Sequence, residues 1–194
     1  MKSILILIFS LSVIQILAQK KADLSLSFLN GKNDLVNFDQ LLGAPSYSGE
    51  GFFSIGLNYT RELKSWLSLE TGLEYSKHEI RITPNLHPDI DLSPRTEKSA
   101  LITIPVGYRL NFLNYAFING GLIFDMDTSL SNSIDNQTGI GAMLGAGLKY
   151  SFKSGLTLTL NPRARMHSIV PFSSDNYHYH LIDSGIKFGI GYRF

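Results

Sequence analysis

Residues 139–150 read GIGAMLGAGLKY, and every second residue from Ile140 to Tyr150 is apolar or aromatic. The intervening positions hold glycine, Met143 and Lys149. Alternation with a period of two is typical of a β-strand whose two faces meet different surroundings. This stretch therefore predicts a strand that is apolar on one face only.

The same alternation recurs along the chain and predicts eight strands, at residues 22–30, 52–62, 65–80, 98–111, 115–126, 139–152, 155–167 and 181–194. Tight turns join the second strand to the third, the fourth to the fifth and the sixth to the seventh. The other connections are long and polar: residues 31–51, 81–97, 127–138 and 168–180. Short turns at one end and long loops at the other are typical of outer-membrane barrels, with the turns in the periplasm. We therefore expect an all-β fold, an eight-stranded antiparallel up-and-down transmembrane β-barrel.

Glycines indicate which face of the predicted barrel meets lipid. A soluble lipocalin-like barrel also has eight strands, but it turns its apolar face inward. Nearly all strand glycines, such as Gly72 and Gly107, share the polar face, where exposure to water would only weaken a strand. Inside a narrow barrel, glycines leave room for long side chains. The polar face is therefore predicted to line the lumen and the apolar face to meet lipid.

Tyrosines repeat near the ends of the even-numbered predicted strands, at Tyr59, Tyr108, Tyr150 and Tyr192. A repeat of this length indicates a repeated hairpin. If the even strands run toward the periplasm, all four rings lie at the inner membrane–water interface, where amphipathic rings settle.

The N-terminus has the pattern of a secretory signal peptide. Met1 and Lys2 precede an apolar segment at residues 3–17, and Ala18 supplies a small residue before a cut ahead of Gln19. An uncleaved anchor helix is the alternative, but the apolar segment is short for one. We expect residues 1–18 to be a signal peptide and residues 19–194 to form the outer-membrane β-barrel domain.

Composition excludes several classes of function. Lys and Arg total 17 against 16 Asp and Glu in 194 residues, so no strong net charge points to nucleic acid. Cysteine is absent, which removes disulfides, thiolate zinc sites, a cysteine nucleophile and a lipidated cysteine. No complete catalytic or cofactor motif occurs. We therefore assign no catalytic residue, metal or cofactor.

Charged residues in the polar phase predict an ion-paired lumen formed by Glu70, Glu74, Arg109, Arg163, Arg165 and Lys187. Buried charges need partners, because an unpaired one is costly. The strand directions place Arg109 nearer Glu70 than Glu74, and they make the cations of the seventh strand the partners of Glu74. An anion-attracting stripe of Arg163, Arg165 and His167 at the loop-side mouth is the alternative.

The C-terminus supplies the most specific signal. Lys187, Gly189, Tyr192 and Phe194 form the pattern polar, x, Gly, x, x, aromatic, x, aromatic, with Phe as the last residue. This pattern looks like the signal by which the barrel-assembly machinery takes up outer-membrane substrates. We therefore expect that machinery to be a partner of the chain.

Three other residue groups suggest chemistry only weakly. His178 and His180 could form half of a metal site, but no further ligand is evident nearby, so a loop-surface position is expected. Two acidic pairs lack the loop spacing of a calcium site and are expected to be solvated: Asp89 with Asp91, and Asp125 with Asp127. His167, Ser168 and Asp175 could suggest a hydrolase triad, but adjacent strand residues point to opposite faces.

The whole mature chain resembles the outer-membrane β-barrel domain family common in Bacteroidota, the PorT-like group often labelled "porin family". The resemblance rests on residues 102–108 (ITIPVGY), the glycine-rich residues 139–150 and the closing residues 189–194 (GIGYRF). It implies fold and location. Because the family is functionally mixed, the resemblance assigns no catalytic residues.

These observations favour a non-enzymatic outer-membrane barrel with a structural or interaction role. Outer-membrane lipid is one expected partner, long extracellular loops are the expected contact surface for proteins, and a link to protein export is one form of this role. The alternatives are a lipid-modifying outer-membrane enzyme and a narrow passive pore.

Overall fold

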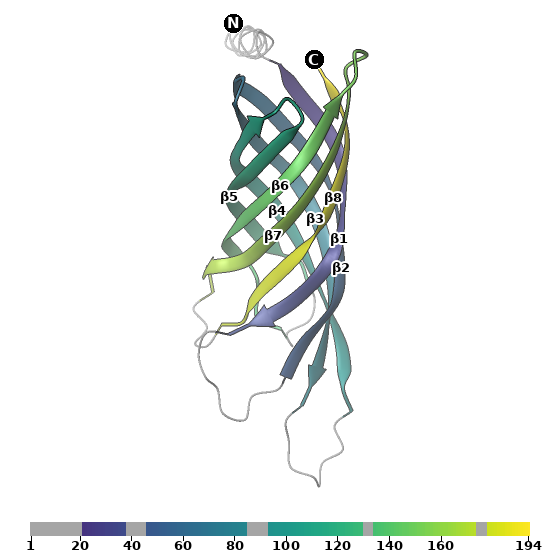
Figure 1. The fold of residues 1–194 in the computed structure, drawn as a ribbon. Coiled ribbons are helices and arrows are strands. Elements are labelled where there is room, and N and C mark those ends of the chain that lie inside the picture. The colour runs from purple at the N-terminus through teal and green to yellow at the C-terminus, as the bar shows by residue number, and fades with distance from the viewer. Residues whose placement is uncertain (1–20, 38–45, 85–92, 130–133, 174–177) are drawn as a thin grey trace, which may run out of the picture.

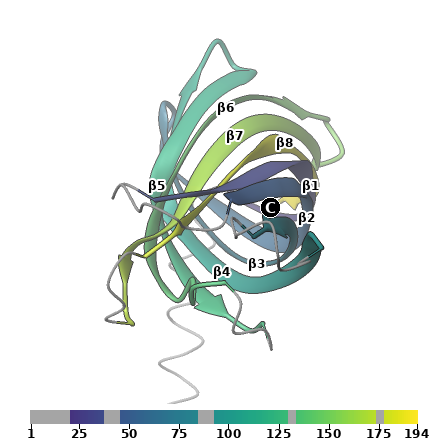
Figure 2. The same ribbon diagram turned by 90° about the horizontal axis from the view of Figure 1, so that it is seen from below.

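The computed structural model describes residues 21–37, 46–84, 93–129, 134–173 and 178–194. Its strands form one closed antiparallel barrel in sequence order, in which the last strand pairs with the first (Figure 1, Figure 2). The strands are β1 (Ala22–Val36), β2 (Ser46–Lys64), β3 (Leu67–Thr83), β4 (Arg95–Phe112), β5 (Ala116–Asp127), β6 (Gly139–Ser151), β7 (Leu156–Pro171) and β8 (His180–Arg193). The expected all-β, eight-stranded barrel is thus confirmed. In the described ranges, no helix is long and apolar enough to cross a membrane. The expected signal peptide at residues 1–18 lies outside those ranges.

The start of β1, the end of β8 and the three tight turns all lie at one end of the barrel, the upper end in Figure 1. The ring closes there through two backbone hydrogen bonds: Phe194 N–H donates to Ala22 O over 2.9 Å, and Ala22 N–H donates to Phe194 O over 3.0 Å. In the turn between β4 and β5, Leu113 and Asn114 have φ values of 52° and 60°. The opposite end carries the longer connections, as the alternation of loop lengths predicts.

Five strands (β1, β2, β3, β4 and β7) continue at least three residues farther toward the loop end than their apolar alternation predicts. For example, β1 ends at Val36 rather than residue 30, and β2 begins at Ser46 rather than residue 52. Beyond the apolar belt, the polarity of the two faces exchanges: on β3, Lys77 is exposed on the outer face, whereas Ile80 and Ile82 are buried inside. A strand search with a fixed apolar phase stops at this exchange, but backbone pairing continues. The long links expected at residues 31–51, 81–97 and 168–180 are shorter accordingly.

Within the belt, apolar side chains face outward and polar ones fill the lumen. Leu73 and Phe188 are 55% and 56% exposed, whereas Ser76 and Thr103 are each 1% exposed. The glycines of the polar phase make room for lumen side chains. A Cβ at Gly56 would lie 2.7 Å from Cγ of Glu74, so a larger residue would displace this glutamate.

Apolar side chains close the loop end of the lumen. Leu35, Ile80, Leu101 and Leu181, here called the outer cluster, are buried inside the barrel, and Tyr47, Ile134 and Tyr179 pack against them. Gln137 connects the link between β5 and β6 to the start of β8 beside this cluster. Leu181 N–H donates to Gln137 Oε1 over 3.0 Å, and Gln137 Nε2 donates to Tyr179 O over 2.8 Å. The interior of the barrel therefore changes from polar to apolar toward the loop end.

Candidate functional site

Glu74 of β3 is the centre of the charged layer beneath the outer cluster. Its carboxylate, 2% exposed, pairs with Arg163 and Arg165 of β7 and Lys187 of β8. Arg165 Nη1 and Lys187 Nζ donate to it over 3.1 and 2.9 Å. The two partners from β7 are the ones that strand direction predicts for Glu74.

A second charged layer lies closer to the end of the barrel that carries the tight turns. Glu70 pairs with Arg109, and it accepts a hydrogen bond from Asn119 over 2.8 Å. The Arg109 guanidinium lies over the Phe117 ring, 3.9 Å from its centroid. The structure thus places Arg109 against Glu70 rather than Glu74, in the order that the strand directions predict.

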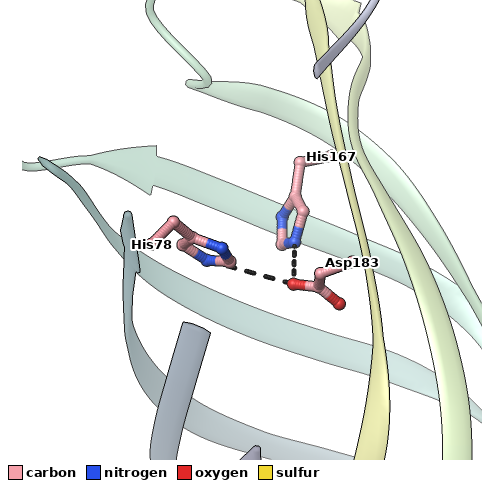
Figure 3. A group of neighbouring side chains, drawn as sticks. All are labelled: His78, His167 and Asp183. Carbon is pink, nitrogen blue, oxygen red and sulfur yellow. Dashed lines mark hydrogen bonds and ion pairs between the residues drawn. The ribbon is translucent and has the colours of Figure 1, made fainter. Parts of the chain in front are cut away.

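Asp183 of β8 connects the charged layer around Glu74 to His78 and His167 (Figure 3). Arg165 donates to both of its oxygens, and His167 Nε2 lies 2.9 Å from Asp183 Oδ2. His167 Nδ1 lies 3.0 Å from Oδ2 of Asp125 on β5. The two ring nitrogens of His167 thus lie beside two carboxylates, one from β8 and one from β5. We call the following set the ion-paired layer: Glu74, Asp125, Asp183, Arg163, Arg165, Lys187 and His167.

His78 lies between the ion-paired layer and the apolar side chains above it. Its ring stacks on Phe52, with centroids 5.0 Å apart and an interplanar angle of 8°. Its Nε2 lies 3.0 Å from Ser76 Oγ and 3.9 Å from Asp183 Oδ2. The ring is fully buried, so it is part of the lumen filling rather than a group open to solvent.

One atom each from His78, His167 and Asp183 could in principle hold a metal ion, since these atoms lie within 4.8 Å of one another. Metal ligation would require loss of the hydrogen bond between His167 and Asp183, whose atoms already lie 2.9 Å apart. It would also place a dication beside the Arg165 guanidinium, whose Nη2 is 2.7 Å from the same Asp183 oxygen. Such repulsion in a buried site is severe. The arrangement therefore suits a hydrogen-bonded ion network better than a metal centre.

The structure corrects the interpretation of several acids and histidines. Asp125 is not a solvated loop acid: it is 4% exposed and accepts a hydrogen bond from Thr103 over 2.6 Å. Asp127 instead organises the link from β5 to β6, where its Oδ2 accepts from Gln137 N–H over 2.9 Å. His178 is 8% exposed, so the expected loop-surface position is wrong for this residue.

The two histidine rings meet edge to face, at an interplanar angle of 67°, rather than around a metal site. The His178 and His180 ring centroids lie 5.1 Å apart, and His180 Nδ1 lies 2.8 Å from the Ser168 carbonyl oxygen. Within the described ranges, no third ligating side chain joins the two rings. Asp89 and Asp91, the other weak candidates, lie outside those ranges.

The structure does not form the hydrolase triad, but the reason differs from the expected one, which was that His167 and Ser168 point to opposite faces. His167 and Ser168 do not lie on opposite faces, because Ser168 has a φ of 51° and both residues are fully buried. The register between β6 and β7 shifts at this point, as it does at a β-bulge. Ser168 Oγ has no hydrogen-bond partner in the described chain, so no serine–histidine pair forms there. Asp175 lies outside the described residues.

The sequence analysis did not identify the inward position of His78 or the ion pair between Asp23 and Lys149. His78 lies in the polar phase of β3 with Glu74 and Ser76, and this phase could have suggested its inward position. Asp23 of β1 and Lys149 of β6 form an ion pair of 3.1 Å near the end of the barrel that carries the tight turns. Their pairing depends on which strands face each other across the lumen, which the alternation pattern does not contain.

The residues of the expected assembly signal divide between the two faces of β8. Lys187 points into the lumen toward Glu74, and a Cβ at Gly189 would lie 2.6 Å from Thr159 Oγ1. Tyr192 and Phe194 are 58% and 64% exposed on the outer face. The same segment pairs with β1 and so closes the barrel.

The fold is similar to those of solved outer-membrane proteins. The outer membrane protein OprG from Pseudomonas aeruginosa has a TM-score of 0.56 at 10% identity, over 90% of this chain and 95% of that one. The outer membrane protein AlkL, solved in lipid bilayers, has a TM-score of 0.50 at 11% identity, over 89% of this chain and 90% of that one. At these identities the likeness concerns the fold alone.

No curated protein matches the chain by sequence. The family known as outer membrane protein beta-barrel domain matches residues 3–194, which is nearly the whole chain. Together with the closed barrel and its apolar outer belt, this match places the protein in the outer membrane. The chain belongs to the outer membrane protein beta-barrel domain family.

Proposed function

We propose that this protein is a non-enzymatic barrel with a closed lumen that presents its loop end to protein partners outside the cell. The observation that carries this proposal is the filling of the lumen at two successive levels. The outer cluster occupies the loop end, and the ion-paired layer lies beneath it. An eight-stranded barrel is just wide enough for side chains to fill its interior.

Charge balance supports a closed rather than a conducting lumen. The ion-paired layer holds three carboxylates, Glu74, Asp125 and Asp183, against Arg163, Arg165 and Lys187, with His167 between two of the acids. A passing ion would have to separate these buried pairs, and breaking such pairs is costly. The lumen charges therefore act as a packed plug.

The loop end offers a projecting, charged surface for a partner. β2, β3 and β4 contain 19, 17 and 18 residues, whereas β5 and β6 contain 12 and 13, so one side of the barrel projects farther (Figure 1). The outer face of this projection is charged, with ion pairs between Lys98 and Glu79 at 2.9 Å and between Arg81 and Glu50 at 2.7 Å. We call this projection the outer ribbon, formed by residues 46–51, 77–83 and 95–100.

Planar-bilayer recordings test the closed lumen directly. The purified protein is expected to insert without stable conductance steps. A reproducible open channel for the unmodified chain would contradict the proposal and favour the narrow pore.

Site-specific photocrosslinking tests the contact surface. A photoreactive residue at Thr96 on the outer ribbon is expected to capture a distinct cell-surface protein in intact cells. The matched control replaces Trp66, which is exposed in a periplasmic turn. Identical products from both positions, or none from Thr96, would contradict an interaction role for this end.

We further propose that the chain is a PorT-like protein of the Bacteroidota type with a role in protein export. This proposal is supported by the resemblance of residues 102–108, which lie in the centre of β4, and of residues 189–194, which close the barrel. A deletion strain is expected to retain export cargo in the periplasm, while its lipid A mass spectrum stays unchanged. Normal secretion would contradict the export role, and altered lipid A that the wild-type gene restores would instead favour an enzyme.

A further inference from the structure

The lumen contains a cavity of about 410 Å³ at the end of the barrel that carries the tight turns. Phe117, whose ring lies against Arg109 of the second charged layer, belongs to its lining. Trp66 and Tyr115, both exposed, line it from the turns between β2 and β3 and between β4 and β5. The interior of an eight-stranded barrel is just wide enough for side chains to fill. A cavity of this size at its mouth is therefore space for water or for a ligand.

Two charged side chains that line this cavity have no ion-pair partner among the residues that the structure describes. They are Glu62 of β2 and Arg193 of β8, and both are partly buried. The neighbouring acid is satisfied, because Asp23 pairs with Lys149 over 3.1 Å and accepts a hydrogen bond from Thr157 over 3.0 Å. A charge that is withdrawn from water without a partner is unfavourable. Glu62 and Arg193 therefore offer one acid and one cation to a ligand.

The strand register gives the spacing of these two charges. Asp23 of β1 is the direct partner of Arg193 on one side and of Thr60 on the other, and Glu62 follows two residues after Thr60. Neighbouring strands lie about 4.8 Å apart, so the backbones of β8 and β2 lie about 10 Å apart at this level. An extended peptide spans at most about 3.3–3.6 Å per residue, so the two ends of a peptide of two or three residues have a similar separation.

The uncharged part of the lining also suits a peptide. Asn111 Nδ2 donates to Ser68 Oγ over 2.9 Å, which leaves the amide oxygen of Asn111 to accept from a peptide N–H. Trp66 and Phe117 provide apolar surface for a small side chain. A simple anion would bring a second negative charge near Glu62, and a neutral sugar would leave both charges unpaired. A ligand with one charge of each sign meets both requirements.

We propose that this cavity binds a short zwitterionic peptide, whose ammonium pairs with Glu62 and whose carboxylate pairs with Arg193. The cavity lies at the opposite end of the barrel from the outer ribbon, so this proposal is independent of the contact surface described above. Tight turns of outer-membrane barrels lie in the periplasm. Short peptides there come from two sources, the stem peptides of the cell wall and fragments of periplasmic proteins.

Trp66 is the only tryptophan of the chain, so its fluorescence reports directly on this cavity. The folded protein in detergent is titrated with trialanine, and a saturable change in fluorescence is expected. Trialanine with an acetylated N-terminus or an amidated C-terminus should bind about tenfold more weakly, since each blocked peptide loses one hydrogen bond between charged groups. The absence of a saturable change, or equal binding of free and blocked peptides, would overturn the proposal.

A second peptide in the same titration distinguishes the two sources. The wall tripeptide L-alanyl-D-glutamyl-diaminopimelate carries the same terminal charges on a different framework. Tighter binding of this tripeptide than of trialanine would assign the site to the cell wall. Equal or weaker binding would assign it to protein fragments.

Two variants assign the ends of the peptide separately. Glu62→Gln should bind free and acetylated trialanine equally, and Arg193→Gln should bind free and amidated trialanine equally, while each variant keeps its discrimination at the other end. Lys153→Gln is the matched control, because Lys153 is an exposed cation in the turn between β6 and β7 and does not line the cavity. It should keep both discriminations.

Unboiled gel mobility confirms the folding of every variant. Should one of them fail to fold, the blocked peptides give the decision on the unmodified chain alone. A folded Glu62→Gln or Arg193→Gln variant that discriminates at its own end like the wild type would overturn the proposal.

Discussion

Arg165 donates hydrogen bonds to both carboxylate oxygens of Asp183, from Nε over 2.9 Å and from Nη2 over 2.7 Å. The two residues are also direct partners in the register of β7 and β8, so this bidentate pair lies along the wall of the barrel. Arg165 Nη1 reaches across to Glu74 of β3 over 3.1 Å. One guanidinium therefore joins a neighbouring-strand pair to a distant wall, which makes the ion-paired layer a single network.

Replacing Asp183 should destabilise the barrel strongly. Asp183→Asn keeps the shape of the side chain but leaves Arg165 and His167 without their anion in a site that is 1% exposed. Removing one partner of a buried pair costs about 3–5 kcal/mol. The temperature at which unboiled samples lose their folded gel mobility should fall accordingly. Glu79→Gln, which removes an exposed partner of Lys98, should lower this temperature far less; equal losses would mean that the lumen pairs are solvated.

A double-mutant cycle should detect coupling between Glu74 and Arg163. Glu74→Ala removes the carboxylate that three cations share, although Arg165 keeps Asp183. Arg163→Ala removes one of these cations, so the double variant should lose less stability than the sum of the single variants. Residues in one ion network show coupling of about 0.5–3 kcal/mol. Denaturant unfolding in detergent measures the four stabilities. Strict additivity, or equally strong coupling of Glu74 to Arg109, would contradict the observed pairing.

The C-terminal residues should matter for assembly more than for stability of the finished barrel. Phe194→Asp retains the backbone hydrogen bonds with Ala22 but removes the terminal aromatic side chain, which is 64% exposed. Outer-membrane levels should fall severalfold, and deletion of residues 192–194 should lower them further. Leu113→Asp changes an apolar residue that is 67% exposed in a periplasmic turn and serves as control. Normal levels of Phe194→Asp would show that these residues are not the assembly signal.

Closure of the barrel between β1 and β8 can be tested with a cysteine pair, since the chain contains no other cysteine. Leu26 and Ile190 are direct partners in the register, and directly opposed residues lie about 4.5–5.5 Å apart, within the range that a disulfide spans. Leu26→Cys with Ile190→Cys should cross-link on mild oxidation in membranes, seen as altered mobility after boiling. Leu26→Cys with Leu144→Cys on β6 should not. Efficient cross-linking of the second pair would contradict the strand order.

Local alternation in the sequence was enough to determine the barrel and which face of its wall is apolar and exposed. The period of two, the glycines of the polar phase and the alternating turn lengths each follow from the geometry of a single strand or hairpin. The alternating directions of the strands also predicted that Arg109 pairs with Glu70 and that Arg163 pairs with Glu74. This was possible because strand direction fixes the height of each residue along the barrel. The pattern therefore described the wall of the barrel and part of its interior.

The tertiary structure alone decided that Asp125 and His78 join this layer of the lumen. Asp125 of β5 and His78 of β3 reach the layer of His167 and Asp183 because the strands tilt and stagger around the ring, and no periodicity along one strand contains that stagger. The same holds for the bulge at Ser168, which turns two adjacent residues inward. The strand ends near the loops were also not predicted, since the two faces exchange polarity where the apolar belt ends. Sequence periodicity reports the surroundings of each face, whereas contacts between distant strands arise only when the sheet closes on itself.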